Sequence, residues 1–420
     1  MKRRRILLSC FYFSPYRGSE AGVGWRVATG LAAKYDVTVL CGDFTPQGIT
    51  AGDLRKYREA GGEFPPGLEV HEIRADECAQ ALHRIHALPG MWAFYYLAYA
   101  RWQRQALKLA QELHARLPFE LAHHVNIIGF REPGYLWRLG IPWFWGPIAG
   151  ASMILWPYLA LMSRAEKFRW GSRNILNAWQ IRTNRRCREA ACHARHIWAV
   201  TPEDCRMVTD VWGCKVEPML ETGASLVEGV TPRMLARGET LKLVWSGLFQ
   251  GRKALPLVLE ALGTLKDRKW TLSILGNGPE AQSWKDIART IDVADRIEWC
   301  GMLPRDGALE VMRDSHVLLH SSLKEGTPHV VLEALALGVP VICHDACGMG
   351  TAVTDSCGIK IPMINPRVSV AGFRQALQRV LDEPELVERL SRGAIQRASE
   401  LSWQSNMDRY SRAYETLWAD

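Results

Sequence analysis

Short apolar runs alternate with longer amphipathic stretches along most of the chain, and they fall into two series. The first series begins at residues 6–13, continues through a glycine-bearing loop and a helical stretch, and reaches a second apolar run at 37–40. The second series opens at 241–245, after a polar segment at 225–240. Continuous apolar runs joined by helices are typical of buried parallel strands. The pattern therefore predicts an α/β protein with two doubly wound, Rossmann-like domains.

One stretch of the second series carries two carboxylates. Residues 325–328 have loop chemistry, residues 330–337 predict a mostly buried helix, and Gly338 is a typical helix stop. Glu325 lies in the loop, and Glu333 lies inside the helix. A helix N-terminus offers N–H groups to an anion, whereas a carboxylate accepts hydrogen bonds from hydroxyls. A ligand with both phosphate and ribose would use both features, and the structural alternative is a capping acid with a buried ion pair.

Two further loops follow predicted strands and contain glycines. In the loop at 246–254, Gly247 precedes the cationic pair Arg252 and Lys253 at a predicted helix start, an arrangement that suits a diphosphate. The loop at 14–25 also holds several glycines, but they do not fit the dinucleotide pattern G-x-G-x-x-G. These glycines would let the backbone approach a ligand closely, and a plain strand-to-helix turn is the alternative.

The stretch at 325–341 fills every fixed position of E-G-x-P-x-V-x-x-E-A-x-A-x-G-x-P-V. It resembles the E-x7-E signature of retaining glycosyltransferases of family 4, which have the two-domain GT-B fold, and in particular a bacterial polysaccharide or lipopolysaccharide subgroup. The resemblance covers nearly the whole chain and is strongest at residues 241–345. This resemblance is more specific evidence for a function than the carboxylate pair alone, and it implies roles for individual residues.

The resemblance implies that Glu333 binds the ribose hydroxyls of a nucleotide donor and that Glu325 faces the transferred sugar. Lys253 matches the lysine of the family's diphosphate cradle. Arg252 is expected to replace the family's arginine, because Leu248 occupies the usual position of that arginine. The other residues expected to bind the donor are Gly247, Gly276, Gly278, Gly326, Thr327, Pro328 and Val330.

In the first series, the resemblance assigns Gly22, Gly24 and Glu20 to a loop over the donor diphosphate and the acceptor. Residues 121–126 predict the end of a strand and include two adjacent histidines, and ligands of open α/β sheets gather beyond such strand ends. Family members often carry a histidine there, near the transferred sugar. His123 is the expected site residue, with His124 as the alternative, and the expected catalytic set is Glu325, His123 and Lys253.

The GT-B resemblance also implies the domain roles. Residues 1–225 are expected to bind the acceptor and residues 226–400 the donor, while a terminal helix at 401–420 crosses back to the first domain. The implied reaction moves a hexose with retention from a nucleoside-diphosphate sugar to a glycan or lipid-linked acceptor, in cell-surface polysaccharide synthesis. No cofactor or metal is expected, because cations and a helix dipole would stabilise the leaving group and no D-x-D triplet occurs.

Three other functions remain open at this stage. A sugar-nucleotide epimerase and a glycan phosphorylase would use the same fold with a different second substrate. A non-catalytic protein that binds sugar nucleotides or serves as a membrane scaffold would use the donor residues without turnover.

The net charge of +8 is concentrated in the first half of the chain. Residues 1–225 hold 29 Lys and Arg against 20 Asp and Glu, whereas the remainder holds 23 against 24. Within 161–196, nine Lys and Arg face two Glu, and tryptophans are interspersed. This composition favours an anionic membrane surface over nucleic acid, for which no module is present, and a solvated helix face is the alternative.

The eleven cysteines are scattered and form no C-x-x-C pair. Such usage indicates reduced thiols in a cytoplasmic protein, and a basic surface at 161–196 would place it peripherally on the cytoplasmic face of the inner membrane.

Overall fold

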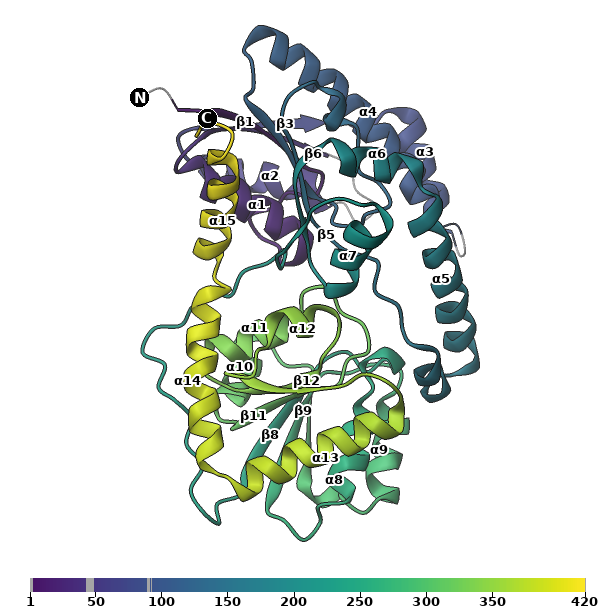
Figure 1. The fold of residues 1–420 in the computed structure, drawn as a ribbon, viewed down its shortest axis with the longest axis vertical. Coiled ribbons are helices and arrows are strands. Elements are labelled where there is room, and N and C mark those ends of the chain that lie inside the picture. Colours follow the sequence, from purple (N-terminus) through teal and green to yellow (C-terminus); the bar gives the residue numbers. More distant parts are fainter. Residues whose placement is uncertain (1–2, 43–48, 89–90, 92, 420) are drawn as a thin grey trace.

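The structure is a computed structural model that describes residues 3–42, 49–88, 91 and 93–419. Two parallel β-sheets lie one above the other in Figure 1. The strands of the first sheet are β1 (Arg5–Cys10), β2 (Asp36–Gly42), β3 (Leu68–Ile73), β4 (Leu121–Asn126), β5 (Trp143–Ile148), β6 (Ala194–Ala199) and β7 (Glu217–Pro218). Those of the second are β8 (Leu241–Ser246), β9 (Trp270–Leu275), β10 (Ile297–Gly301), β11 (Val317–His320), β12 (Val341–His344) and β13 (Gly358–Ile361).

The strand order is β3-β2-β1-β4-β5-β6-β7 in the first sheet and β10-β9-β8-β11-β12-β13 in the second. Apolar clusters are buried on both faces of each sheet. This burial explains why strands such as β1 and β12 are continuous apolar runs in the sequence. The prediction of two Rossmann-like domains is confirmed.

Helices connect the strands and cover the sheets. In the first domain they are α1 (Ser19–Ala32), α2 (Ile49–Glu59), α3 (Glu77–His86), α4 (Ala93–Arg116), α5 (Arg164–Thr183), α6 (Arg185–His193) and α7 (Pro202–Arg206). In the second they are α8 (Leu255–Gly263), α9 (Ala281–Thr290), α10 (Arg305–Arg313), α11 (His329–Ala336), α12 (Cys347–Ala352), α13 (Pro366–Asp382) and α14 (Glu385–Glu400), and the last helix of the chain is α15 (Trp403–Glu415).

The chain crosses between the domains at its C-terminal end. Helix α14 packs against α11 of the second domain, and α15 then packs against α1 of the first, along the left side of Figure 1. Arg409 of α15 pairs with Glu217 of β7 and donates to Pro218 O at 2.6 Å. The end of the chain thus forms part of the first domain.

A second crossing runs in the opposite direction. Residues 154–170, which the sequence assigned to the first domain, contribute Tyr158 and Trp170 to the apolar core beneath the second sheet. The Tyr158 hydroxyl lies 2.6 Å from Ser369 Oγ on α13. The charge-free stretch 140–163 forms β5 and a 3₁₀ turn, and within the described part of the chain no helix is long and apolar enough to cross a membrane.

Candidate active site

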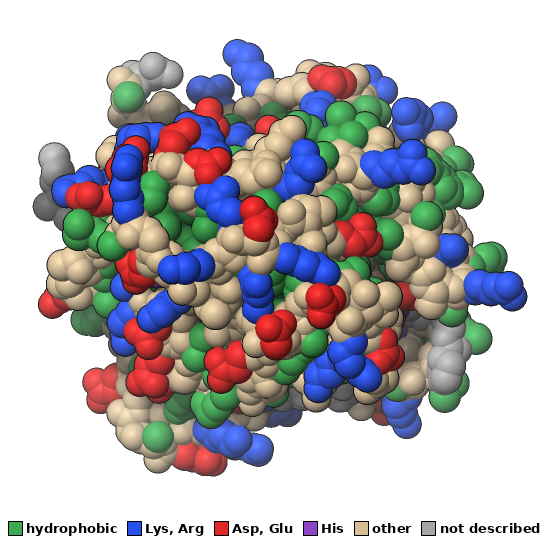
Figure 2. Space-filling model, turned by 90° about the horizontal axis from the view of Figure 1, so that it is seen from below, with side chains coloured by type: hydrophobic (Ala, Val, Ile, Leu, Met, Phe, Trp, Pro, Cys, Tyr) green, Lys and Arg blue, Asp and Glu red, His purple; other side chains and the backbone are tan. Residues whose placement is uncertain are grey.

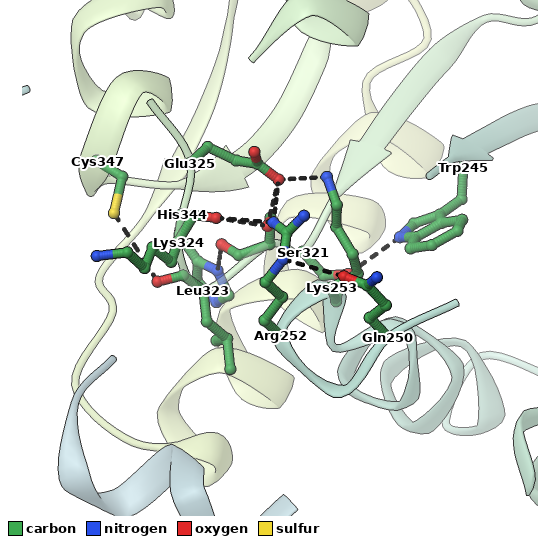
Figure 3. A network of polar contacts seen from close by, with 11 residues as sticks. Trp245, Gln250, Arg252, Lys253, Ser321, Leu323, Lys324, Glu325, His344 and Cys347 are labelled. Carbon is green, nitrogen blue, oxygen red and sulfur yellow. Dashed lines mark hydrogen bonds and ion pairs between the residues drawn. The ribbon is translucent and has the colours of Figure 1, made fainter. Parts of the chain in front are cut away.

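Glu325 lies in the loop between β11 and α11, where three donors converge on one carboxylate oxygen. Its Oε1 accepts hydrogen bonds from Lys253 Nζ, from Arg252 Nη1 at 3.1 Å and from Ser322 Oγ at 2.7 Å (Figure 3). Burial alone would raise the pKa of Glu325, but the charge of Lys253 and other nearby cations outweighs it and lowers the pKa to about 2. The group is therefore a carboxylate at neutral pH.

The loops after β8 and β11 are cross-linked by the residues that hold Glu325. Arg252 Nη1 also donates to Lys324 O at 3.1 Å, and Ser321 Oγ donates to Lys253 O at 2.8 Å. Burial lowers the pKa of Lys253, and Glu325 opposes that shift. The arrangement concentrates two cations and an acid at the C-terminal ends of adjacent strands, which is where open α/β sheets bind ligands.

Three predicted glycines allow the loops beside this cluster to approach closely. Gly276 has φ +126°, and a Cβ there would lie 2.0 Å from Gly247 O. A Cβ on Gly278 would lie 2.6 Å from Phe249 O. Any larger residue would push the two loops apart, so Gly276 and Gly278 fix the position of the turn that bears Arg252 and Lys253.

A crevice of about 640 Å³ opens between the domains, and its lining does not include Glu325, Arg252 or Lys253. It is bordered by Glu333 of α11, by Gly22 of α1 and by the segment after β7. Glu333 Oε1 accepts from Arg305 Nη2 at 3.0 Å. The arginines that line the crevice are Arg17, Arg26, Arg305 and Arg313. The crevice is therefore cationic, with one carboxylate fixed on its lower wall.

The structure thus divides the predicted residues between two neighbouring places. Glu325, Lys253 and Arg252 form the buried cluster, whereas Glu333 and Gly22 border the crevice. The loop that joins them contains Gly326, Thr327 and Pro328, with Val330 partly buried in the first turn of α11. Pro328 is the residue directly before α11. The helix begins at His329, one residue before the start of the helix predicted at 330–337. Gly24 packs instead on the end of β1, where a Cβ would lie 2.5 Å from Tyr12 O.

His123 occupies a different environment from the predicted one. It is fully buried; its Nδ1 lies 2.6 Å from the Tyr414 hydroxyl and its Nε2 lies 2.7 Å from Gly146 O. Burial lowers the pKa of His123 to about 3, so the ring is neutral, donates to the carbonyl and accepts from the phenol. Both nitrogens are used inside the fold, which does not support the predicted contact with a transferred sugar. His124 is buried as well, with Nε2 3.4 Å from Ile127 O.

Sequence reasoning missed two residues that join the domains at the site. Lys324 Nζ donates to Ser152 O, and burial lowers the pKa of Lys324 to about 8. Glu221, in the segment after β7, accepts a hydrogen bond from Thr327 Oγ1. Position next to Glu325 could have drawn attention to Lys324, but the Glu221 contact spans too many residues to be visible in the sequence.

Glu20 of α1 lies on the first-domain side of the site. Its Oε1 accepts from Ile128 N at 3.0 Å, and burial together with nearby Glu221 raises the pKa of Glu20 to about 7. Over the described residues, no group of three or more His, Cys, Asp and Glu side chains could hold a metal ion.

Comparison with known proteins relates the second domain to one family. Residues 233–397 match the family described as "Glycosyl transferases group 1". The chain is 28% identical to the D-inositol 3-phosphate glycosyltransferase of Kribbella flavida over 201 residues, 44% of this chain and 46% of that protein. It is 31% identical to the lipopolysaccharide 1,6-galactosyltransferase of Escherichia coli K12 over 149 residues, 34% of this chain and 40% of that protein. The chain thus spans less than half the length of these curated relatives.

Solved structures resemble the whole chain. Sucrose-phosphate synthase of Thermosynechococcus elongatus superposes with a TM-score of 0.61 at 15% identity, over 99% of this chain and 100% of that one. Alr3699/HepE of Anabaena, in complex with UDP, gives 0.59 at 11% identity, over 99% and 100%. The chain therefore has the GT-B fold, two Rossmann-like domains that face each other. Its second domain is related to the group 1 glycosyl transferases.

Proposed function

We propose that the protein is a retaining glycosyltransferase of family 4 that moves a hexose from a nucleoside-diphosphate sugar to a glycan or lipid-linked acceptor. The observation that carries the proposal is the convergence of Lys253 and Arg252 on Glu325 within a domain related to glycosyl transferases. UDP bound to Alr3699/HepE and the lipopolysaccharide acceptor in the name of the Escherichia coli relative support the two substrate classes.

In the proposed reaction, the bond between the anomeric carbon and the diphosphate oxygen breaks while the acceptor oxygen bonds to the same face of the sugar. The acceptor proton passes to the departing diphosphate. Lys253, Arg252 and the N–H groups at the start of α11 stabilise the charge that develops on the diphosphate, which is how preorganised donors lower such barriers. Glu333 binds the ribose hydroxyls, and Glu325 orients the transferred sugar. No metal takes part in this scheme.

The donor must compete with Glu325 for the two cations. In the structure, Glu325 forms ion pairs with both Lys253 and Arg252 and offsets one of their two positive charges. A bound diphosphate would supply that negative charge itself, because phosphate oxygens are strong acceptors for Lys and Arg. Glu325 would then be free to accept hydrogen bonds from the sugar hydroxyls, so donor binding and the positioning of Glu325 are linked.

We further propose that α5 docks the protein on an anionic membrane at the cytoplasmic face of the inner membrane. Phe168, Ile175 and Trp179 are 79%, 64% and 61% exposed and follow helical spacing on one face. The exposed cations of this helix are Arg164, Lys167, Arg169, Arg173 and Arg182. At the lower end of the second domain, by contrast, both signs of charge are interspersed (Figure 2).

The position of α5 relates this surface to the donor loop. A Cβ on Gly251 would lie 2.8 Å from Glu166 Oε2, so α5 begins beside the turn that bears Arg252 and Lys253. A lipid-linked acceptor held in the bilayer would then arrive close to the cluster. Replacement of Phe168 and Trp179 by Ser should lower the affinity for phosphatidylglycerol vesicles, measured by cosedimentation, by at least about tenfold. The variant lacks two apolar side chains that would otherwise be buried in the bilayer. Unchanged cosedimentation would exclude α5 as the docking surface.

The experiment that tests the proposed function is a thermal-shift screen of nucleoside diphosphates, followed by product analysis with the matching nucleotide sugars. A ligand that binds only the folded state stabilises it by RT ln(1 + L/Kd), where L is the free ligand concentration, and therefore raises Tm. We expect one nucleoside diphosphate to raise Tm and its sugar to be transferred to a glycan acceptor with retained configuration. Conversion of the donor alone, or consumption with free phosphate, would identify an epimerase or a phosphorylase instead.

A further inference from the structure

Glu221 connects the segment after β7 to the loop that contains Glu325. It follows β7, is 7% exposed and accepts a hydrogen bond from Thr327 Oγ1 through its Oε2. Thr327 lies two residues after Glu325, in the loop proposed to hold the donor. A carboxylate from outside the second sheet therefore reaches the same loop as Glu325.

The second oxygen of Glu221 faces an open position. Oε1 lies 3.8 Å from the place that a Cβ would take on Gly326. Among the residues that the structure describes, no donor forms a hydrogen bond with Oε1. Because no donor of the described residues is its partner, this oxygen can accept a hydrogen bond from a hydroxyl group of a ligand that reaches this position.

Glu20 approaches the same region from the first domain. Its Oε1 is fixed by Ile128 N at 3.0 Å, and its Oε2 has no hydrogen-bond partner within the described part of the chain. The two carboxylates are close enough for Glu221 to act electrostatically on Glu20. Tyr12 and Tyr95, whose hydroxyls lie 3.1 Å apart, also interact electrostatically with Glu20.

We propose that Glu221 and Glu20 form a hydroxyl-binding subsite that holds the transferred sugar against Gly326, and that the sugar is a neutral hexose. The inference rests on the proposed function. Each acid offers one free acceptor oxygen from the first-domain side of the loop, and paired acceptors fix a sugar through its hydroxyls. Two neighbouring carboxylates repel a phosphate or a uronate, so the diphosphate belongs with Lys253 and Arg252 instead.

The test is a comparison of two ligands on one variant. Calorimetry measures the affinity of Glu221→Gln for the nucleoside diphosphate found in the thermal-shift screen and for the corresponding nucleotide hexose. The glutamine oxygen still accepts from Thr327, but one free acceptor becomes an amide donor. We expect about tenfold weaker binding of the nucleotide hexose and less than about twofold change for the diphosphate, because one hydrogen bond to a charged group is lost. Glu20→Gln should show the same selective loss.

Two controls separate a sugar contact from a structural role. Glu228→Gln changes an exposed acid of the same segment and should leave both affinities unchanged. Thr327→Val removes the hydrogen bond to Glu221 but keeps the free acceptor oxygens of Glu221 and Glu20, so it should not reproduce the loss that is selective for the hexose. If Thr327→Val does reproduce it, or if Glu221→Gln weakens both ligands equally, Glu221 only positions the loop and the inference is wrong. If the wild-type protein binds no nucleoside diphosphate, the proposed function itself fails and the subsite fails with it.

Discussion

Strands β4 and β11 hold corresponding places in the two sheets, since each pairs with the first strand of its own sheet. A titratable side chain belongs to each: fully buried His123 lies inside β4, and partly buried Glu325 lies in the loop after β11. The partners of His123 are a carbonyl and a phenol that belong to the packed interior. The partners of Glu325 are two cations and a hydroxyl on loops beside the interdomain crevice.

The difference shows that a side chain inside a strand and a side chain in the loop after a strand have different access to a ligand. An anionic ligand can take the place of Glu325 as the partner of Lys253 and Arg252. This site can therefore exchange one anion for another. A carbonyl within the sheet and a hydroxyl on a packed helix cannot be exchanged without unfolding part of the protein. We therefore expect substitutions at the two strand ends to affect different quantities, activity at β11 and stability at β4.

The largest effect is expected for Lys253→Met, which removes one of the two cations. Transfer activity should fall by about 10²–10³-fold in kcat, the loss typical of one preorganised donor to a developing negative charge. The matched control is Lys266→Met, an exposed lysine paired with Asp292. Steady-state kinetics and Tm of both variants check the prediction. Activity within threefold of wild type for Lys253→Met would remove the basis for the proposed function.

At the other strand end, His123→Phe should lower the free energy of unfolding by about 2–4 kcal/mol, because it leaves Gly146 O and the Tyr414 hydroxyl without buried partners. Urea denaturation measures the change. At urea concentrations below the unfolding transition, the folded His123→Phe variant should have the kcat of the wild-type protein. A large loss of kcat with unchanged stability would restore His123 as a catalytic residue.

The two groups should also differ in how they respond to acid. The folded pKa of His123 is about 3, below its ordinary value of 6.5, so the unfolded chain binds more protons and stability falls as the pH drops below 6.5. The folded pKa of Glu325 is about 2, below its ordinary 4.5, so its contribution is lost only below pH 4.5.

Between pH 6.5 and 4.5, the His123→Phe variant should therefore lose stability less steeply than wild type, by about 1.4 kcal/mol per pH unit at most. Urea midpoints at pH 7, 6 and 5 measure both slopes. Parallel slopes for the two proteins would mean that His123 is not the neutral, buried group described above.

The smallest effects come from single hydroxyls at the two strand ends. Tyr414→Phe removes the donor to His123 and should cost about 1 kcal/mol of stability with little change in kcat. Ser322→Ala removes the 2.7 Å bond to Glu325 and should change kcat more than stability, because Lys253 and Arg252 continue to hold the carboxylate. Equal behaviour of the two variants in both assays would erase the distinction between the strand ends.

Local patterns in the sequence were sufficient for the two sheets and for the loop–helix stretch around Glu325. Strand burial is readable from short apolar runs, and the residues that hold Glu325 follow two strands in the order the sequence suggests. The environment of His123 could not be read, because Tyr414 is 291 residues away in the chain. The contact between Glu221 and Thr327, 106 residues apart, depends in the same way on how the two domains meet.

The two crossings between the domains have a consequence for any attempt to take the molecule apart. Residues 154–170 complete the interior of the second domain, and α15 completes the first. Proteolysis of the exposed segment between β7 and β8 would therefore yield two fragments that stay bound to each other, and neither half expressed by itself would contain all the side chains that fill its own interior.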